Sequence, residues 1–200
     1  MTWRTRLWFG PLAAILLCLG IIGLGLIVPG YSQVRETVSE IGEMDSPARI
    51  PFAVMLCGVA ACLLVFASAI RDLAIQVRCS SWPAYLIGFM AVPVAGVGIF
   101  AYPHPLHNVF GLVELIGYQA PLVLAIAWRR EPDAKPVVTF SWIMSALVWT
   151  AIILNLTTFY RHGAIWAAIR PVYGLAQRFL FATWFAWSAG LGLLLLRQGR

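Results

Sequence analysis

The chain has 200 residues, of which 61% are hydrophobic and only 11% are charged. A soluble domain carries about a quarter charged residues, so this composition excludes an ordinary soluble fold and indicates an integral membrane protein. The formal net charge of +6 comes from basic residues scattered through short loops, which argues against a nucleic-acid partner.

Six segments are apolar over about the 20 residues that a helix needs to cross the hydrocarbon core of a bilayer. The predicted spans are approximately residues 7–28, 51–70, 82–101, 108–128, 137–158 and 176–196. Because backbone groups inside hydrocarbon must be satisfied within each segment, we predict an all-α fold, a six-transmembrane-helix bundle. The sequence contains no internal repeat, and residues 1–200 are expected to form a single integral membrane domain.

Basic residues in the connections predict the orientation of the bundle. An even number of spans puts both chain ends on one side, where the loops and termini hold Arg4, Arg6, Arg71, Arg78, Arg129, Arg130, Lys135, Arg197 and Arg200. The opposite loops hold fewer basic residues over more chain, namely Arg35, Arg49, Arg161, Arg170 and Arg178. The positive-inside rule therefore predicts that both termini are cytoplasmic.

The first outer connection, Pro29 to Ile50, is the longest and contains an amphipathic pattern. A helical projection separates the apolar side chains Val34, Val38 and Ile41 from the acidic side chains Glu36, Glu40 and Glu43. We predict a helix that lies in the outer interface of the membrane, with its acidic face in water.

The fourth predicted span carries an unusual polar pair. An ionised carboxylate deep in hydrocarbon costs about 2.5 to 3.5 kcal/mol on insertion scales, so Glu114 needs a partner or a proton. His107 precedes it by seven residues with Gly111 between them, so the three residues share one helical face. The spacing puts His107 about 10 Å nearer the outer surface and leaves a groove at the glycine.

Arg178 begins the last span on the same outer side and is the expected counter-charge of Glu114, since a guanidinium can bind a carboxylate bidentately. The alternative is that Arg178 extends to the interface and pairs with nothing. Ser39 and Glu40 belong to the first outer connection, on the same side of the membrane. The outer end is therefore expected to form one polar pocket from Ser39, Glu40, His107, Glu114 and Arg178.

Three short motifs recur in one order along the chain. They are VSEIG at residues 38–42 with SPA at 46–48, GIFAYP at 98–103 leading to LH at 106–107, and GLAQR at 174–178. With these motifs the chain resembles domain of unknown function 998, a family of small prokaryotic membrane proteins with about six spans. It is also similar to the eukaryotic DRAM, Frag and Sfk-type membrane proteins, which carry a related Ser-acid-x-Gly-to-Pro loop.

The resemblance implies that the polar loop residues belong to a family pattern made of Ser39, Glu40, Gly42, Pro47, His107 and Arg178. It also implies a multi-pass protein of the bacterial or archaeal cytoplasmic membrane. An acid is expected shortly after Phe100, where this chain has Ala101, Tyr102, Pro103 and His104 instead. The family brings no established activity, so the resemblance implies a shared pocket and leaves its chemistry open.

Three functions fit these observations. The favoured one is non-enzymatic: the bundle binds, senses or moves a membrane lipid or small amphiphile, with Arg178 attracting an anionic head group and no cofactor required. The second is a metal-assisted intramembrane hydrolase, with Ser39, Glu40 and His107 as catalytic candidates. Zinc would then be held by His104, His107 and a carboxylate, Glu40 or Glu114. The third is a structural subunit, in a homo-oligomer or beside a partner membrane subunit, closed by an Arg178 ion pair.

Overall fold

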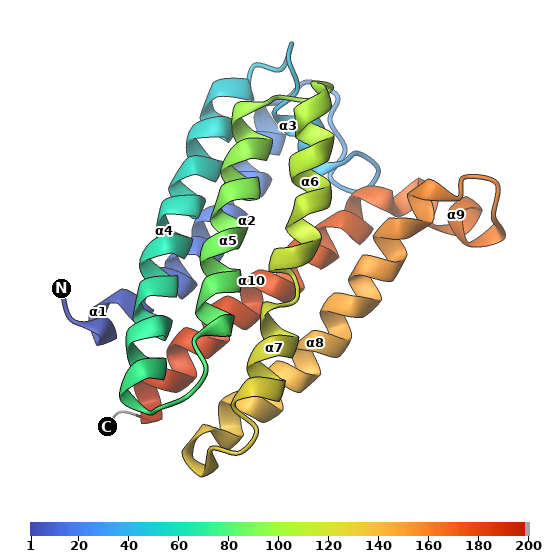
Figure 1. The fold of residues 1–200 in the computed structure, drawn as a ribbon. Helices are drawn as coiled ribbons and strands as arrows, with labels where there is room; N and C mark the ends of the chain where they lie inside the picture. Colours follow the sequence, from blue (N-terminus) through green and yellow to red (C-terminus); the bar gives the residue numbers. More distant parts are fainter. Residues whose placement is uncertain (199–200) are drawn as a thin grey trace.

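The structure, a computed structural model, describes residues 1–198, and every regular element in that range is a helix (Figure 1). The α-helices are α1 (Trp3–Leu7), α2 (Phe9–Ile27), α3 (Val38–Ile41), α4 (Arg49–Gln76), α5 (Trp82–Ile99), α6 (Pro105–Gly117), α7 (Ala120–Ala127), α8 (Lys135–Leu156), α9 (Ala164–Ile169) and α10 (Tyr173–Gln198). Short 3-10 turns occupy Pro132–Ala134, Thr157–Phe159 and Arg170–Val172. Arg200, which contributed to the predicted orientation, lies outside the described residues.

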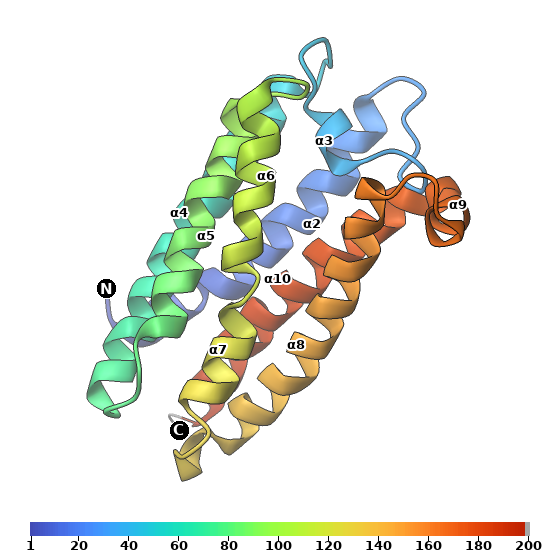
Figure 2. The same ribbon diagram turned by 45° about the vertical axis from the view of Figure 1, so that its right-hand side comes forward.

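Six helical stretches are long and apolar enough to cross a membrane, which confirms the predicted all-α class and number of spans. They are Trp3–Ile27, Arg49–Gln76, Trp82–Ile99, Pro105–Ala127, Pro132–Phe159 and Ala164–Arg197. Both ends of the described chain lie at the same end of the bundle in Figures 1 and 2, and α3 lies at the other end, called here the α3 end. The cytoplasmic location of the termini stays a prediction.

Close packing of α4 against α5 forms the tightest helix pair. A Cβ atom at Gly98 of α5 would lie 3.0 Å from Leu56 Cβ and 3.3 Å from Ala53 Cα, so the glycine lets the two backbones approach. Phe66 and Ile70 of α4 are fully buried on the side facing the rest of the bundle. In hydrocarbon such small-residue contacts drive helix association, because apolar surface alone does not distinguish protein from lipid.

The fourth span is broken into two helices, α6 and α7, which pack against different sets of neighbouring helices. α6 packs along α5, whereas α7 packs on both α5 and α8, so the chain gains α8 as a partner after Tyr118 and Gln119 (Figure 2). Pro121 has no N–H and cannot bond to Gly117 O four residues earlier. The indole Nε1 of Trp184 donates to that carbonyl instead, at 3.1 Å. Pro121 therefore coincides with a helix break whose freed carbonyl is satisfied by α10.

The predicted interfacial helix of the first loop is shorter than expected. α3 contains only four residues, and the chain over 33–36 forms a turn, so Val34 is exposed instead of sharing an apolar face. Val38 and Ile41 are buried as the pattern suggested, yet they face the bundle and not the lipid. Two acids of the pattern form backbone caps: Glu36 accepts from Ser32 N and Glu40 from Thr37 N, both at 2.5 Å. The first loop with α3 therefore covers the end of the bundle and does not lie in the lipid interface.

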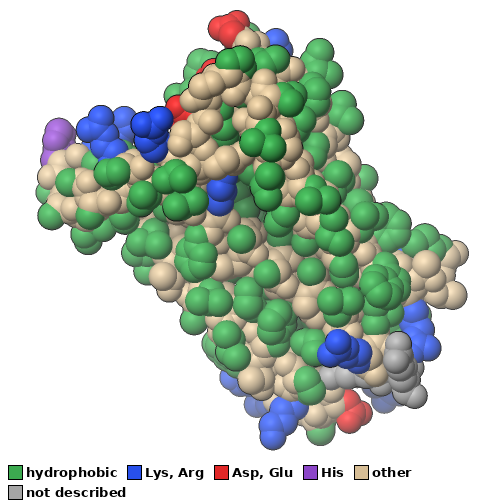
Figure 3. Space-filling model, turned by 180° about the vertical axis from the view of Figure 1, so that it is seen from behind, with side chains coloured by type: hydrophobic (Ala, Val, Ile, Leu, Met, Phe, Trp, Pro, Cys, Tyr) green, Lys and Arg blue, Asp and Glu red, His purple; other side chains and the backbone are tan. Residues whose placement is uncertain are grey.

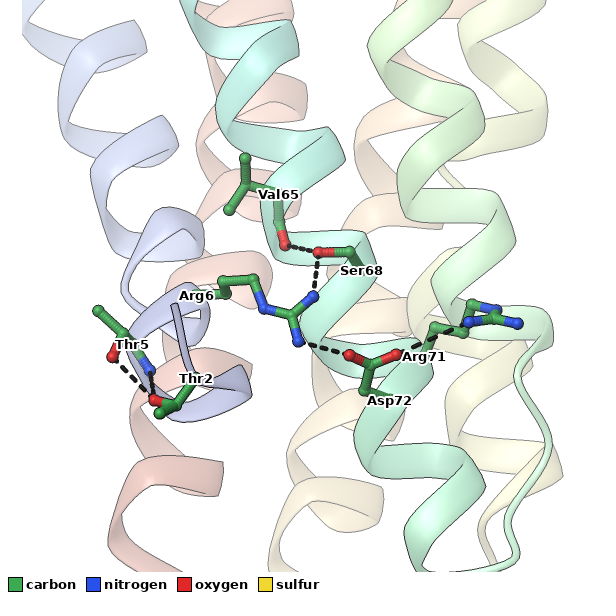
Figure 4. Close-up of polar contacts among 7 residues, drawn as sticks. All are labelled: Thr2, Thr5, Arg6, Val65, Ser68, Arg71 and Asp72. Carbon is green, nitrogen blue, oxygen red and sulfur yellow. Dashed lines mark hydrogen bonds and ion pairs between the residues drawn. The ribbon is translucent and has the colours of Figure 1, made fainter.

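Charged side chains gather towards the two ends of the molecule, with apolar side chains covering much of the surface between them (Figure 3). At the end that holds the termini, Arg6 of α1 joins α4 (Figure 4). Its guanidinium donates to Ser68 Oγ at 2.8 Å and pairs with Asp72, which also lies 3.7 Å from Arg71. α4 continues to Gln76, beyond the predicted boundary at residue 70, and Asp72 of this extension makes the contact.

Candidate functional site

A cleft of about 470 Å³ lies at the α3 end, where α6 and α8 diverge above the break in the fourth span. Residues of α10 line the cleft, and Ser39 of α3 lies at its α3 end. The other polar side chains that line it are His107, Asn108, Glu114, Tyr118, Asn155, Thr158, Arg161, Tyr173 and Gln177. The lining includes the exposed side chains of Leu112, Leu156 and Arg161, and the open part of the cleft where they lie is called here the mouth.

Ser39 and His107 are in direct contact at the α3 end of the cleft. The His107 Nε2 atom lies 2.9 Å from Ser39 Oγ, although the two residues are 68 positions apart in the chain. The other ring nitrogen, Nδ1, lies 2.9 Å from Phe100 O and 3.1 Å from Val97 O. Carbonyl oxygens only accept, so Nδ1 carries a proton. In the neutral imidazole Nε2 then has the lone pair, and the Ser39 hydroxyl donates to it.

The Phe100 and Val97 carbonyls are free for this contact because α5 ends beside them. Phe100 is the C-terminal cap of α5, and the last carbonyls of a helix have no partner in the helix itself. His107 lies in the first turn of α6, which begins after the short turn at residues 100–104. The local fold therefore presents two carbonyl acceptors to one imidazole nitrogen and leaves the other nitrogen facing Ser39.

Glu114 lies deeper in the same cleft, about 10 Å from His107 along the axis of α6 at 1.5 Å per residue. Its Oε2 accepts a hydrogen bond from the Tyr118 hydroxyl at 3.0 Å. Its other oxygen, Oε1, has no hydrogen-bond partner among residues 1–198 and is not sealed from the cleft. A polar acceptor is therefore presented in an otherwise mainly apolar part of the bundle.

Arg178 does not pair with Glu114, so the predicted ion pair is wrong. Its guanidinium donates to Gln33 Oε1, Glu36 O and Gly174 O, each at 2.9 Å, and to the hydroxyl of Tyr31. Burial raises the pKa of the Tyr31 phenol, which stays neutral and donates to Thr37 O at 2.8 Å. Arg178 thus holds the folded-back loop against the start of α10 and is not part of the cleft lining.

Gly174 allows that loop to come close. A Cβ atom at this position would lie 2.8 Å from Gln33 O and 2.9 Å from Val34 O, closer than real side chains approach. The loop carbonyl of Val34 accepts from Leu175 N at 3.2 Å. The GLAQR motif therefore combines a glycine for backbone contact with an arginine that donates to backbone and side-chain oxygens of the loop.

Glu40 is also engaged away from the cleft. Its carboxylate accepts from Thr37 N at 2.5 Å and from Thr37 Oγ1 at 2.9 Å, which completes a capping box at the start of α3. This cap sets the orientation of the α3 turn that presents Ser39. The expected five-residue pocket therefore divides: Ser39, His107 and Glu114 line the cleft, whereas Glu40 and Arg178 hold the loop above it.

The residues considered for zinc have separate contacts. The His104 Nδ1 atom accepts from Leu106 N at 3.1 Å, and the ring centre lies 5.2 Å from that of Phe100, with the two rings tilted by 33°. His107 bonds to Ser39, and Glu40 bonds to Thr37. Over the described chain, no group of three or more His, Cys, Asp or Glu residues is placed to hold a metal ion.

Sequence reasoning missed seven polar residues of the cleft lining, and three of them have contacts that bear on the site. Arg161 supplies a basic group at the mouth, where its Nε donates to Thr158 O at 3.2 Å. Gln177 accepts from Val38 N at 2.6 Å, beside Ser39. Asn155 donates to Ala151 O and Ala176 O. An available signal was the position of Asn155 inside a predicted span, where an amide requires partners.

Comparison with known proteins gives one result. The sequence model of the family described as "Protein of unknown function (DUF998)" matches residues 11–194. No curated protein and no solved structure matches the chain. The match extends from the second helix almost to the end of the last, so it includes every residue of the cleft.

Proposed function

The chain belongs to the DUF998 family of uncharacterised multi-pass membrane proteins, and we propose that it binds a membrane lipid or small amphiphile in the cleft between α6 and α8. The observation that carries this proposal is the lining of the cleft. It combines polar groups at the α3 end with mainly apolar side chains at the mouth and deeper in the bundle, where Glu114 and Tyr118 are the polar exceptions. A ligand with a polar head and an apolar tail is complementary to such a lining.

Arg161 gives the proposed ligand a preferred charge. The residue is exposed at the mouth, and within residues 1–198 no ion pair involves it. Its guanidinium also lies 6.0 Å from the centre of the Trp166 ring, which leaves donors available for a ligand. We therefore expect an anionic head group at Arg161, in the role that the sequence suggested for Arg178.

The depth of the cleft matches one leaflet of the bilayer. Its lining runs along α6 from His107 to Tyr118, about 16 Å at 1.5 Å per residue, or about half of the hydrocarbon core. With both termini in the cytoplasm, as the positive-inside rule predicts, the ligand would come from the outer leaflet of a bacterial or archaeal cytoplasmic membrane.

Lipid retention tests the proposal through two matched glycine substitutions. Gly111 lines the cleft, Gly23 lies on the exposed face of α2, and a Cβ atom at either position would have no neighbour within 4 Å. We expect Gly111→Trp to fill the cleft and Gly23→Trp to project into detergent, with both proteins folded. Native mass spectrometry after release from mild detergent should detect a retained lipid in wild type and Gly23→Trp, and its loss in Gly111→Trp.

The same spectra identify the charge preference and the alternatives. Arg161→Gln should reduce retention of anionic lipid more than retention of zwitterionic lipid. Equal retention in Gly111→Trp and Gly23→Trp would overturn the proposed site. A bare chain in every sample, at a subunit number above one, would instead favour the structural-subunit hypothesis.

A further inference from the structure

We propose that Ser39 and His107 form a nucleophile and general base that cleave a carboxylic ester of the lipid bound in the cleft. The inference rests on the proposed function for its substrate, because the ester must reach Ser39 through the same cleft. It differs from a metal-assisted hydrolase, since the attacking group is a side chain of the protein. The observation that carries it is the contact between Ser39 Oγ and His107 Nε2 at 2.9 Å.

The imidazole is held in the protonation state that this chemistry needs. A serine hydroxyl is a weak nucleophile until an adjacent base accepts its proton. In serine hydrolases a third group holds the other ring nitrogen as a donor, which fixes the tautomer. Here the carbonyls of Phe100 and Val97 do so at Nδ1, and Nε2 presents its lone pair to the serine.

Ser39 is also directed away from the local contacts that serine side chains usually make. A serine near a helix start commonly caps a backbone N–H of its own turn, but Thr37 and Glu40 already cap α3. The only side-chain hydrogen bond of Ser39 within residues 1–198 goes to His107. Both residues line the cleft, so a bound ester can approach the hydroxyl.

Gln177 is placed to stabilise the charge that develops on the ester oxygen. Because its Oε1 accepts from Val38 N at 2.6 Å, the amide orientation is fixed and Nε2 is the group that remains. Gln177 lines the cleft with Ser39, and its Nε2 makes no hydrogen bond to another residue of the 1–198 range. The geometry therefore assigns it as a positioning donor for the oxyanion.

The reaction balances without a cofactor. Ser39 Oγ forms a bond to the ester carbonyl carbon while its proton passes to His107 Nε2. The carbon–oxygen bond to the alcohol then breaks, and the alcohol leaves with the proton from Nε2. Water, deprotonated by the same nitrogen, attacks the acyl-serine, and its proton returns to Ser39 as the free carboxylic acid departs.

The location of the pair fits ester chemistry. His107 lies in the first turn of α6, close to the α3 end of its span. The ester linkages of glycerolipids lie at the boundary between the head groups and the hydrocarbon. Arg161, at the mouth, can hold an anionic head group while the acyl chain lies along the deeper apolar lining.

A fluorophosphonate probe tests the nucleophile directly, because it reacts with an activated serine and adds a fixed mass. We expect intact mass spectrometry of the wild-type protein in detergent to show one adduct, which peptide mapping places on Ser39. Ser46 of the same loop is the internal control, since its hydroxyl donates to Ile41 O at 2.6 Å and has no imidazole acceptor. The labelling rate should fall at least about 100-fold in His107→Gln and vanish in Ser39→Ala.

Lipid retention in the same samples separates this inference from the proposed function. Labelling of Ser39 in the wild-type protein, together with retained lipid in Ser39→Ala, supports both the nucleophile and the binding function. Retained lipid with no Ser39 labelling in wild type overturns the nucleophile and leaves the binding function in place. Labelling of Ser39 in a protein that retains no lipid supports the nucleophile and overturns the binding function. Unchanged labelling in His107→Gln, with unfolding excluded by an unchanged melting temperature, overturns the role of the base.

Discussion

The hydrogen bond from Trp184 to Gly117 O provides a sharp test of how the fourth span is broken. Trp184 is fully buried, and its Nε1 donates at 3.1 Å to the carbonyl that Pro121 leaves without a helical partner. Trp184→Phe retains an aromatic ring at this site but removes the donor. The Gly117 carbonyl would then be buried without a partner in an environment that holds no water to replace it.

The expected loss of stability has two parts. An unsatisfied buried acceptor costs about 1 to 3 kcal/mol in proteins generally, whereas single hydrogen bonds between membrane helices average about 0.6 kcal/mol with a maximum near 1.7. The smaller ring also loses packing against Tyr118 and Trp187, whose ring centres lie 6.3 and 5.8 Å from that of Trp184. At about 0.8 kcal/mol for each buried methylene equivalent, we expect a total of about 2 to 3 kcal/mol.

A double-mutant cycle with Pro121→Ala isolates the hydrogen-bond part. Alanine restores an N–H that can donate to Gly117 O, so Trp184→Phe should be about 1 kcal/mol less destabilising in the Pro121→Ala background. Reversible unfolding in mixed micelles, followed by tryptophan fluorescence, measures the four free energies. Trp187→Phe is the matched control, because Trp187 is equally buried but donates to Ser141 Oγ at 2.9 Å. The reasoning about Pro121 would be refuted if, for both tryptophans, the destabilisation in the double variant equals the sum of the two single-variant destabilisations within about 0.3 to 0.5 kcal/mol.

Two further predictions concern the arginines that join loops to helices. Arg178→Ala should destabilise the protein by about 3 kcal/mol, since hydrogen bonds from charged groups contribute about 1.5 to 3 kcal/mol each, and Arg178→Lys should restore part of it. Thermal unfolding in detergent measures this loss of stability. Arg35→Ala is the control, since Arg35 is an exposed residue of the same loop. Equal melting temperatures for Arg178→Ala and Arg35→Ala would contradict the prediction. Arg6→Gln should cost about 1 to 2 kcal/mol by releasing α1 from α4, whereas Arg71→Gln, more exposed and 3.7 Å from Asp72, should change stability by less than about 0.5 kcal/mol. A larger effect from Arg71 would show that the Arg6 contact is not the main link.

The spans were predictable because length and hydropathy determine them almost alone. The break in the fourth span was visible as Pro121, but its consequence was not, because a proline does not reveal which helix each half will pack against. Because α6 packs on α5 while α7 packs on both α5 and α8, the space between α6 and α8 becomes the cleft. A single sequence contains the proline but does not show that only the second half of the span will pack on α8.

The candidate residues show the same limit. Charge balance alone favoured Arg178 as the partner of Glu114. The loop over residues 28–48 instead folds back and offers one backbone carbonyl and two side-chain oxygens to the guanidinium. These acceptors reach Arg178 only through the fold of the loop, so the sequence does not show that they compete with Glu114. The contact between Ser39 and His107 was suggested only as membership of one pocket, and its distance and tautomer required the structure.

Leu112 and Leu156 line the cleft and are exposed on two membrane-spanning helices, so the cleft is accessible from the surrounding lipid, and this changes how occupancy of the site should be expressed. A ligand that enters from the bilayer arrives by two-dimensional diffusion, and its effective concentration is its mole fraction among the surrounding lipids. A modest preference over neighbouring lipids is then enough for occupancy, even when affinity from water cannot be measured. Diluting the lipid with detergent would lower that mole fraction, so occupancy should follow the lipid-to-detergent ratio and not the protein concentration.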